Sequence, residues 1–443
     1  MTSRHTGLAR TKALWRSGPF ARLWFGTILS ALADGAFMIL LAWFIVDATG
    51  SEAVLGMTLV CFSLPRVLFM LAGGVLADRW SRKWILLLSM LARSLILILF
   101  SGLLATGTAS GMPESVYAVA LLFGTVDAFF WPARSSILPS IVPRDQLPAA
   151  NSMMEISQQI SMVCGPLAAA LLMRTESYPL MFASLAFFFA AGALVLSSLH
   201  TLPYRGTGGD ALDHSDHPGP ASFLRDIGNG IRYCLSVPIL CIIFGTSLTV
   251  NMVLSGPINM GLPLLVKDLG WDGSDYGTLG MMMGVGTIAG GLIAVLCNGL
   301  RGRFLLIPFL LCLGGAATGS LYFMESLPFG LVSMSLLGMV ISSTNVPLLT
   351  YMQTITPGDL LGRVMSLLSL MSIGMGPVSY TVCSLLLENR LITPAFLMLA
   401  GGICMALLSL SLYLFRDYRE AERHPDWASA ASGVSGQSTT LSS

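Results

Sequence analysis

Twelve apolar segments, each long enough to cross a membrane, run through this sequence and leave few folds open to it. A helix of about 20 apolar residues spans the hydrocarbon core of a bilayer. Only 11% of the residues are charged, whereas a soluble domain carries about 25%. We therefore predict an all-α integral membrane protein with twelve transmembrane helices. The segments lie near residues 22–47, 54–77, 84–106, 115–137, 148–173, 178–199, 236–265, 276–299, 303–324, 328–351, 361–387 and 394–415.

A long polar stretch divides the twelve segments into two sets of six. Residues 201–232 are rich in glycine, aspartate, histidine and proline and form the longest polar interruption. The chain beyond Asp417 is charged and then rich in serine and alanine, a composition typical of disorder. The predicted regions are a cytoplasmic N-terminal segment (1–21), an N-terminal six-helix bundle (22–200), a cytoplasmic linker (201–235), a C-terminal six-helix bundle (236–416) and a disordered cytoplasmic tail (417–443).

The distribution of lysine and arginine predicts that both termini lie in the cytoplasm. Of the 24 lysines and arginines, Arg66 and Arg93 fall within apolar segments. With a cytoplasmic N-terminus, nineteen of the others lie in inner segments, and only Arg174, Lys267 and Arg390 lie in outer ones. Inner loops of membrane proteins carry such an excess of basic residues. The same count supports an even number of helices.

The two sets of six share an approximate sequence repeat. Ile141-Val-Pro-Arg-Asp-Gln-Leu147 precedes the fifth segment, which contains Gly165-Pro166. Ile355-Thr-Pro-Gly-Asp-Leu-Leu361 precedes the eleventh, which contains Gly376-Pro377. The repeat predicts two pseudo-symmetric bundles, and the glycine–proline pairs are expected to bend their helices. Transporters built from such repeats hold their substrate near the membrane midplane, where the repeats meet.

The loop after the second segment carries the most specific motif. Gly74-Val-Leu-Ala-Asp-Arg-Trp-Ser-Arg-Lys83 is a short basic turn with one acid, Asp78. Its spacing resembles the loop between the second and third helices of major facilitator superfamily transporters. Ser81 stands where that family usually has a second glycine. The resemblance implies the twelve-helix major facilitator fold over nearly the whole chain.

Two stretches near the fifth segment narrow the resemblance. Phe130-Trp-Pro-Ala-Arg-Ser-Ser-Ile-Leu-Pro139 and Val142-Pro-Arg-Asp-Gln-Leu-Pro-Ala-Ala-Asn151 resemble the bacterial macrolide-efflux and enterobactin-exporter branch of that superfamily. Gly165-Pro166 is similar to the Gly-Pro of the fifth-helix motif in proton-coupled drug antiporters, without that motif's fuller series of glycines. The resemblance implies export in exchange for protons.

The same resemblance implies a gate on the cytoplasmic side. In the family, the acid and the bases of this loop latch the two halves together. The N-terminus of the eleventh helix should lie near Asp78, and its dipole favours an acid there. The bases could instead serve only to fix topology and to anchor lipid headgroups. The predicted gate residues are Gly74, Asp78, Arg79, Arg82 and Lys83, with Arg134 and Arg363 as partners.

Five ionisable residues fall inside the apolar segments, all of them in the first six. A charge at membrane depth is costly, so each is a candidate functional residue. With a rise of about 1.5 Å per residue, Asp34 and Arg66 lie at similar levels near the midplane and could pair. Asp127 and Glu155 should lie level with each other nearer the cytoplasm, where Arg93 could neutralise one of them.

Three acids against two bases leave one carboxylate without a partner. A desolvated carboxylate near a like charge can hold a proton near neutral pH and release it as access alternates. Asp34 is the first choice because it is nearest the midplane. Alternatively, all five residues fasten helices together without titrating. The predicted proton-coupling candidates are Asp34, Asp127 and Glu155, and their charge partners are Arg66 and Arg93.

The substrate cavity of this fold is lined by the first, fourth, seventh and tenth helices. Here those segments offer few charges, several aromatic rings and some amides. That mixture favours a bulky hydrophobic or amphipathic substrate over a sugar or a phosphate, although most such aromatic residues in membrane helices are packing residues. The cavity candidates are Phe37, Trp43, Phe130, Trp131, Asn251, Asn259, Asn345 and Tyr351.

No motif indicates an enzyme, a metal site or a nucleotide site. The sequence has no Gly-x4-Gly-Lys-Ser/Thr phosphate loop, which disfavours transport driven by ATP. Its eight cysteines form no Cys-x-x-Cys pair, and residues 210–217, rich in Asp and His, are interpreted as a solvated spacer. We expect a monomer without metal, cofactor or nucleic acid, with a small-molecule substrate, the lipid bilayer as its surroundings and a proton gradient as its energy source.

The sequence therefore predicts a secondary transporter of a bacterial plasma (inner) membrane. It would export small hydrophobic or amphipathic compounds, such as drugs, macrolides or siderophore-like molecules, by proton antiport. The first alternative is an importer or facilitator of a nutrient, since fold does not settle function. A non-transporting receptor or an intramembrane enzyme would need an extra folded domain or a catalytic constellation, and the sequence shows neither.

Overall fold

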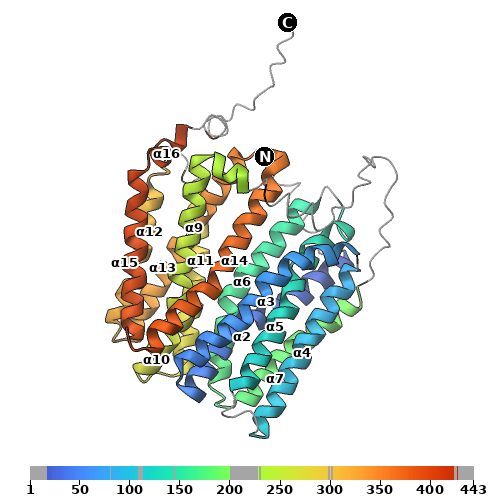
Figure 1. The fold of residues 1–443 in the computed structure, drawn as a ribbon. Helices are drawn as coiled ribbons and strands as arrows, with labels where there is room; N and C mark the ends of the chain where they lie inside the picture. The colour runs from blue at the N-terminus through green and yellow to red at the C-terminus, as the bar shows by residue number, and fades with distance from the viewer. Residues whose placement is uncertain are drawn as a thin grey trace. The chain divides into compact units, whose positions relative to one another are not determined.

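The computed structural model describes residues 17–79, 81–107, 113–143, 146–199, 228, 231–297, 300, 303–423 and 427, with side chains except at 70–79 and 359. Every regular element among these residues is helical (Figure 1). Twelve helices, some of them composite, are long and apolar enough to cross a membrane. The predicted all-α fold with twelve spanning helices is confirmed. Most of the predicted linker, including the Asp/His run, lies outside the described residues.

The first six spans closely match the predicted windows. Proline occupies the first turn of α2, α6 and α7, where its missing N–H has no helical partner to lose. Gly50 ends α2 in the left-handed conformation with φ of 59°, which a residue with a Cβ rarely adopts. The spans are α2 (Gly18–Thr49), α3 (Glu52–Arg79), α4 (Arg82–Ala105), α5 (Pro113–Ile137), α6 (Leu147–Met173) and α7 (Tyr178–Ser197), with the 3-10 turn η1 (Leu138–Ser140) after α5.

The last six spans include three composite helices. The seventh is interrupted by the π-helical segment η3 (Pro257–Gly261), which lies between α9 (Pro238–Gly256) and α10 (Leu262–Asp268). The others are α11 (Gly273–Leu296), α12 (Leu306–Ser320) with η5 (Leu321–Phe323), α13 (Leu327–Ile355), α14 (Gly358–Glu388), and α15 (Pro394–Ser411) with η6 (Leu412–Leu414).

Glycines allow neighbouring backbones to touch in both sets of helices. A Cβ at Gly124 of α5 would lie 2.0 Å from the carbonyl oxygen of Phe62 on α3. A Cβ at Gly286 of α11 would lie 1.9 Å from the carbonyl oxygen of Ser335 on α13. Lipid gives helices little hydrophobic reason to associate, so close contact between backbones supplies much of the packing energy.

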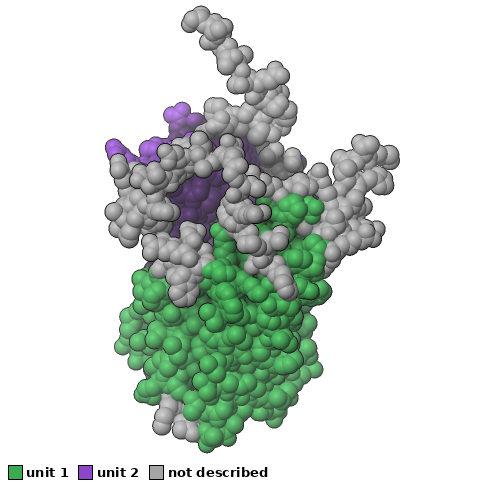
Figure 2. Space-filling model, turned by 90° about the vertical axis from the view of Figure 1, so that its right-hand side faces the viewer, with its two compact units in different colours: residues 1–211, 255–284, 376–394 green, residues 212–254, 285–375, 395–443 purple. Residues whose placement is uncertain are grey.

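The chain forms two compact units (Figure 2). Their boundaries cut across three spans. Unit 1 comprises residues 1–211, 255–284 and 376–394, and unit 2 comprises 212–254, 285–375 and 395–443. The seventh span, α11 and α14 therefore each contribute one part to either unit. In unit 1, these parts pack on the first six spans; a Cβ at Gly284, for example, would lie 2.5 Å from the carbonyl oxygen of Met162 on α6.

Part of the C-terminal tail is folded onto unit 2. The short helix α16 (Arg416–Arg419) and the 3-10 turn η7 (Ala421–Arg423) follow the last span. Trp427 is 2% exposed, and Tyr418 is also buried. The predicted disorder beyond Asp417 is therefore wrong for these residues, because their aromatic side chains find a core to enter. Residues 428–443 lie outside the described part of the chain.

Candidate functional site

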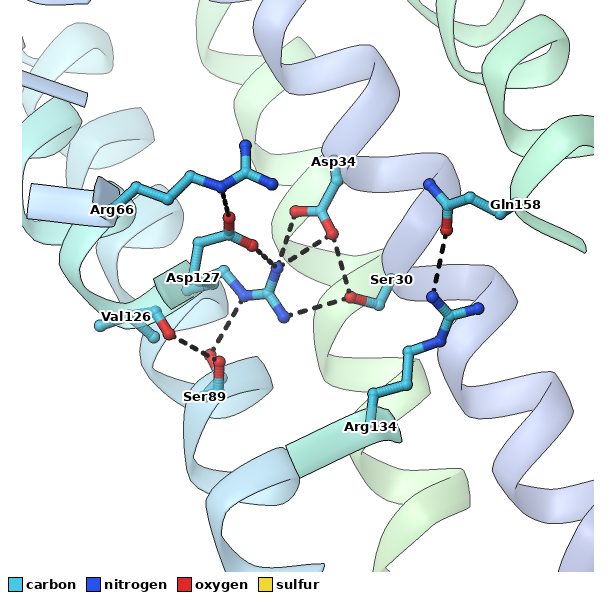
Figure 3. Close-up of polar contacts among 9 residues, drawn as sticks. Ser30, Asp34, Arg66, Ser89, Val126, Asp127, Arg134 and Gln158 are labelled. Atoms are coloured by element: carbon cyan, nitrogen blue, oxygen red, sulfur yellow. Dashed lines mark hydrogen bonds and ion pairs between the residues drawn. The ribbon is translucent and has the colours of Figure 1, made fainter. Parts of the chain in front are cut away.

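Four of the first six spans bring ionisable side chains together in unit 1. Asp34 comes from α2, Arg66 from α3, Arg93 from α4 and Asp127 from α5 (Figure 3). Two carboxylates and two guanidinium groups cancel in charge. We call these four residues the charge cluster.

Arg93 lies at the centre of the charge cluster and has no exposed surface. Its Nη1 donates to Asp34 Oδ1 at 2.7 Å and Oδ2 at 3.0 Å, and also to Asp127 Oδ1 at 3.2 Å. Its Nη2 donates to Ser30 Oγ, and its Nε donates weakly to the Ser89 carbonyl at 3.4 Å. All three nitrogens are thus satisfied, as a buried guanidinium requires.

Aromatic rings surround the same guanidinium. Its central carbon lies 4.5 Å from the ring centre of Phe130 on α5 and 4.6 Å from that of Phe189 on α7. Phe123 is farther away, at 5.8 Å. The negative ring faces attract a desolvated cation. The cluster therefore holds Arg93 by ion pairs along its edge and by rings around it.

Asp127 is shared between two arginines. Its Oδ1 accepts from Arg93, and its Oδ2 lies 3.1 Å from Arg66 Nε. The Asp127 side chain is only 5% exposed, whereas Arg66 is 28% exposed. Asp34, at 21% exposed, is the more accessible of the two acids.

The structure corrects two details of the predicted charge arrangement. Asp34 pairs with Arg93 and not with Arg66. Asp127 joins Asp34 in the cluster and does not lie level with Glu155 as predicted. Arg134, seven residues after Asp127 on α5, bonds to Met154 and Gln158 on either side of Glu155, so Glu155 lies about 10 Å along the helices from Asp127. The expectation that Arg93 could neutralise either Asp127 or Glu155 is met by Asp127.

Glu155 stands apart from the charge cluster. Its side chain on α6 is exposed, and it forms no ion pair with any residue that the structure describes. Nearby, Arg134 donates to the carbonyl oxygen of Met154 and to Gln158 on α6, and it lies over the ring of Trp131. Among the three acids, Glu155 is therefore the one for which the described part of the chain provides no ion pair.

Sequence reasoning missed the hydroxyl groups of the cluster. Ser30 Oγ donates to Asp34 Oδ2 at 3.3 Å, and Ser89 Oγ donates to the carbonyl oxygen of Val126. Each serine stands four residues before a charged member of the cluster, one helical turn away. A serine at that spacing from an intramembrane charge is the signal that could have identified both.

Three of the predicted cavity aromatics are buried packing residues. Phe37 stacks on Phe123 at 3.9 Å between ring centres, Phe130 packs against Arg93, and the side chain of Tyr351 is fully buried in unit 2. Their rings therefore line no cavity in this structure, which corrects the prediction. The mistake arose because an aromatic ring in a membrane helix has the same sequence signature whether it faces a neighbour or a cavity.

The predicted asparagines are placed in two ways. Asn251 and Asn259 each donate to a carbonyl oxygen one turn earlier in their own span, at 2.8 and 2.9 Å. Asn345 is exposed on α13, so its amide is free to meet a substrate or lipid.

Trp43 does line a cavity, at the end of unit 1 that the charge distribution predicts to be external. This cavity has a volume of about 380 Å³, and Asp47 and Tyr178 also line it. Tyr178 donates its hydroxyl to Asp47 Oδ2 at 2.7 Å, and Lys267 forms an ion pair with Oδ1 of the same carboxylate. Asp47 thereby ties α2 to α7 and α10.

The predicted cytoplasmic gate is only partly described. Asp78 and Arg79 form the last turn of α3, but their side chains and that of Gly74 lie outside the described residues. Lys83 donates to the Ser197 carbonyl at the end of α7, at 2.9 Å. Arg82 begins α4 and Arg363 lies in the second turn of α14, while Arg134 bonds α6. The gate therefore stays a prediction.

The two predicted glycine–proline pairs differ in their packing. Pro166 lies inside α6 and Pro377 inside α14. A Cβ at Gly165 would lie 2.9 Å from the Cα of Gly35, next to Asp34. A Cβ at Gly376 would meet only the ring of Tyr380, at 3.5 Å. The first pair thus permits a close helix contact beside the charge cluster.

The sequence matches the family model of the Major Facilitator Superfamily over residues 23–380. It is 28% identical over 408 residues to macrolide efflux protein A of Streptococcus pyogenes, covering 88% of this chain and 94% of that protein. It is 25% identical over 409 residues to the multidrug efflux pump Tap of Mycolicibacterium fortuitum, covering 90% and 93%.

Solved transporter structures share the fold. The nucleoside transporter NupG superposes with a TM-score of 0.68 at 15% identity, covering 91% of this chain and 99% of that one. A D-xylose-proton symporter superposes with a TM-score of 0.65, also at 15% identity, covering 91% and 98%. At such identities the likeness concerns architecture alone.

Proposed function

This chain belongs to the major facilitator superfamily, and we propose that it exports small, largely hydrophobic or amphipathic compounds in exchange for protons. The superfamily consists of transporters, and twelve spanning helices make the chain a multi-pass membrane protein. Two relatives that align over most of its length are named for macrolide efflux and multidrug efflux. They support export and a bulky, apolar substrate class.

The observation that carries proton coupling is the sharing of Arg93 between two acids of unequal exposure. Asp34 is 21% exposed and Asp127 is 5% exposed, and both accept from the same Nη1. Water and protons therefore have better access to Asp34. The buried Asp127 remains as a fixed counter-charge for both arginines.

Protonation of Asp34 would change the balance of the cluster. The neutral acid loses its ionic attraction to Arg93, which stays bonded to Asp127. The cluster then carries one net positive charge, and a net charge in a low-dielectric site favours a conformation that readmits water and lets the proton leave again. Loading and release of a proton at Asp34 would thus be linked to the alternation of access.

The gate on the predicted cytoplasmic side belongs to the same proposal. Asp78 at the end of α3 would interact with the N-terminal turn of α14, whose dipole favours an acid. Both termini would then lie in the cytoplasm of a bacterial cell, and the helices would cross its plasma (inner) membrane. Asp78→Asn should leave insertion intact and slow turnover, and Arg82→Ala should slow it less because Arg79 and Lys83 remain.

The decisive experiment uses purified protein in proteoliposomes with an imposed proton gradient. Erythromycin and ethidium serve as probes, and accumulation against their own gradient is measured. Asp34→Asn should abolish uphill transport while probe binding and downhill exchange persist. Glu155→Gln is the matched variant: it also neutralises an intramembrane acid, but one outside the charge cluster, and it should keep uphill transport.

Two results would contradict the proposal. If Asp34→Asn, Asp127→Asn and Glu155→Gln all concentrate the probes like wild type, the acids are fasteners and do not carry the coupled proton. If wild type moves the probes only down their gradients, or only into cells, the chain is a facilitator or an importer on the same fold.

A further inference from the structure

The chain after the last span returns to the start of α12. The Glu422 carboxylate accepts from the backbone N–H of Phe304, just before that helix, and Tyr413 donates its hydroxyl to the Leu305 carbonyl at 2.8 Å. An acid at this position also complements the dipole of α12. All of these residues belong to unit 2.

The same segment also contacts the C-terminal end of α13. The Tyr351 hydroxyl donates to the Ala421 carbonyl at 3.1 Å. The ring of Phe304 lies 4.8 Å from that of Tyr351 and 5.3 Å from that of Tyr418, and Trp427 lies 5.1 Å from Tyr351. All four rings are almost fully buried. Such a cluster stabilises through apolar burial and edge-to-face contacts.

The part of α13 that the tail contacts follows a proline. Pro347 stands inside the helix, four residues before Tyr351. Proline removes one backbone hydrogen bond and allows a helix to bend. Without an external hold, the last two turns of α13 could therefore change direction.

The N-terminal half ties the equivalent helix ends in another way. Lys83 at the start of α4 donates to the Ser197 carbonyl, and Arg22 of α2 donates to the Ser198 carbonyl, at the end of α7. The third and sixth spans are thus tied by bases on helix-end carbonyls. The first turns of α12 contain no base, and Arg303, three residues before the helix, is exposed; the contacts described at this end run instead through Glu422 and Tyr413.

We propose that Arg416–Arg423 and Trp427 form a clasp that fixes the ends of α12 and α13 as one body, and that efficient transport depends on it. The clasp replaces the basic ties of the N-terminal half with a glutamate and an aromatic core. It acts on α13, the tenth span, which is expected to line the substrate path. The tail is thereby a working part of the transporter.

The test is Trp427→Ala in the full-length protein, read by hydrogen exchange and by transport. Exchange of the Phe304 amide and of residues 351–355 should accelerate at least about tenfold, because local opening governs exchange. The maximal rate of ethidium or erythromycin transport should fall several-fold with the half-saturating concentration unchanged. Trp427→Phe, which keeps an aromatic ring, should leave both the exchange rates and the maximal transport rate close to wild type.

Phe415→Ala is the matched control, since this exposed ring precedes the clasp without entering it; it should match wild type. If Trp427→Ala does not fold, Glu422→Ala removes only the acceptor of the Phe304 N–H and should still accelerate exchange there. Unchanged exchange at Phe304 in both variants, or faster exchange with wild-type transport, would overturn the clasp. Exchange is measured without substrate, so a failure of the export proposal leaves this measurement decisive.

Discussion

The first six spans bring two acids and two bases together where they meet, whereas the described spans of unit 2 carry charged residues only near the start of α14. Both sets use glycines for close contact, at Gly124 between α3 and α5 and at Gly286 between α11 and α13. These are equivalent helix pairs, the second with the fourth and the eighth with the tenth. Close packing therefore needs no buried charge, and the charge cluster calls for a functional explanation.

Loss of Arg93 should have the largest effect and tests whether the first half depends on its charges. Arg93→Met leaves two carboxylates facing each other with only Arg66 nearby, and removing one partner of a buried ion pair costs about 3–5 kcal/mol. The measurement is the thermal unfolding midpoint in detergent. Arg416→Met, at an 80% exposed ion pair, should change it little. If Arg93→Met and Arg416→Met lowered the unfolding midpoint equally, the first half would depend on its buried charges no more than the second half depends on an exposed ion pair.

Alanine at the two close contacts should show where the halves agree. Gly124→Ala and Gly286→Ala each force a methyl group against a backbone carbonyl, and such overpacking costs about 1–3 kcal/mol. Gly102→Ala and Gly245→Ala are controls, because a Cβ at either position meets nothing within 4 Å. If only one of Gly124→Ala and Gly286→Ala lowered the free energy of unfolding, the two helix pairs would not be equivalent.

The two acids of the cluster should differ in how much they contribute to the free energy of unfolding. Asp127 is buried between two arginines and Asp34 is partly exposed with one. Asp127→Asn should therefore lower the free energy of unfolding by about 1 kcal/mol more than Asp34→Asn. Urea or thermal unfolding measures the difference. Equal stabilities would mean that Asp127 is no better suited than Asp34 to serve as the fixed counter-charge.

The smallest effect is expected at the basic tie of the first half. Lys83→Ala removes one exposed hydrogen bond to the Ser197 carbonyl, so less than about 1 kcal/mol of stability should be lost. Hydrogen exchange at the end of α7 should nevertheless rise. We expect the aromatic clasp to contribute more stability than the basic tie. If Lys83→Ala lost more stability than Trp427→Ala, that order would be wrong.

Much of the fold could be predicted because each span is an apolar run of the right length. The members of the charge cluster were visible for the same reason, since an ionisable residue in such a run is conspicuous. Their pairing was not, because depth was counted from an assumed helix end. Asp34 and Asp127 both accept from Nη1 of Arg93, so they lie side by side although they stand at different distances from their helix ends.

The ring contacts had no comparable signal. Phe189 lies in a run of three phenylalanines on α7, and nothing in that run distinguishes the one that faces Arg93. The clasp was hidden by the composition of the tail, which is charged and then poor in apolar residues. Tyr418 and Trp427 are the only large aromatic residues of the tail after Asp417. Two aromatic residues 9 positions apart do not define a helical or strand periodicity.

The π-helical segment η3 makes the length of the seventh span as significant as its composition. A π turn holds one residue more than an α turn, so everything after Gly261 is rotated by about 100° relative to an unbroken helix. Lys267, which pairs with Asp47, therefore stands about where residue 266 would stand in an unbroken helix. Deleting a single residue from 257–261 would convert the π turn to an α turn and leave the lysine facing its partner, whereas one further inserted residue would turn it away by about 100°. The segment can therefore lose one residue, as a surface loop can, without changing which helix face meets Asp47.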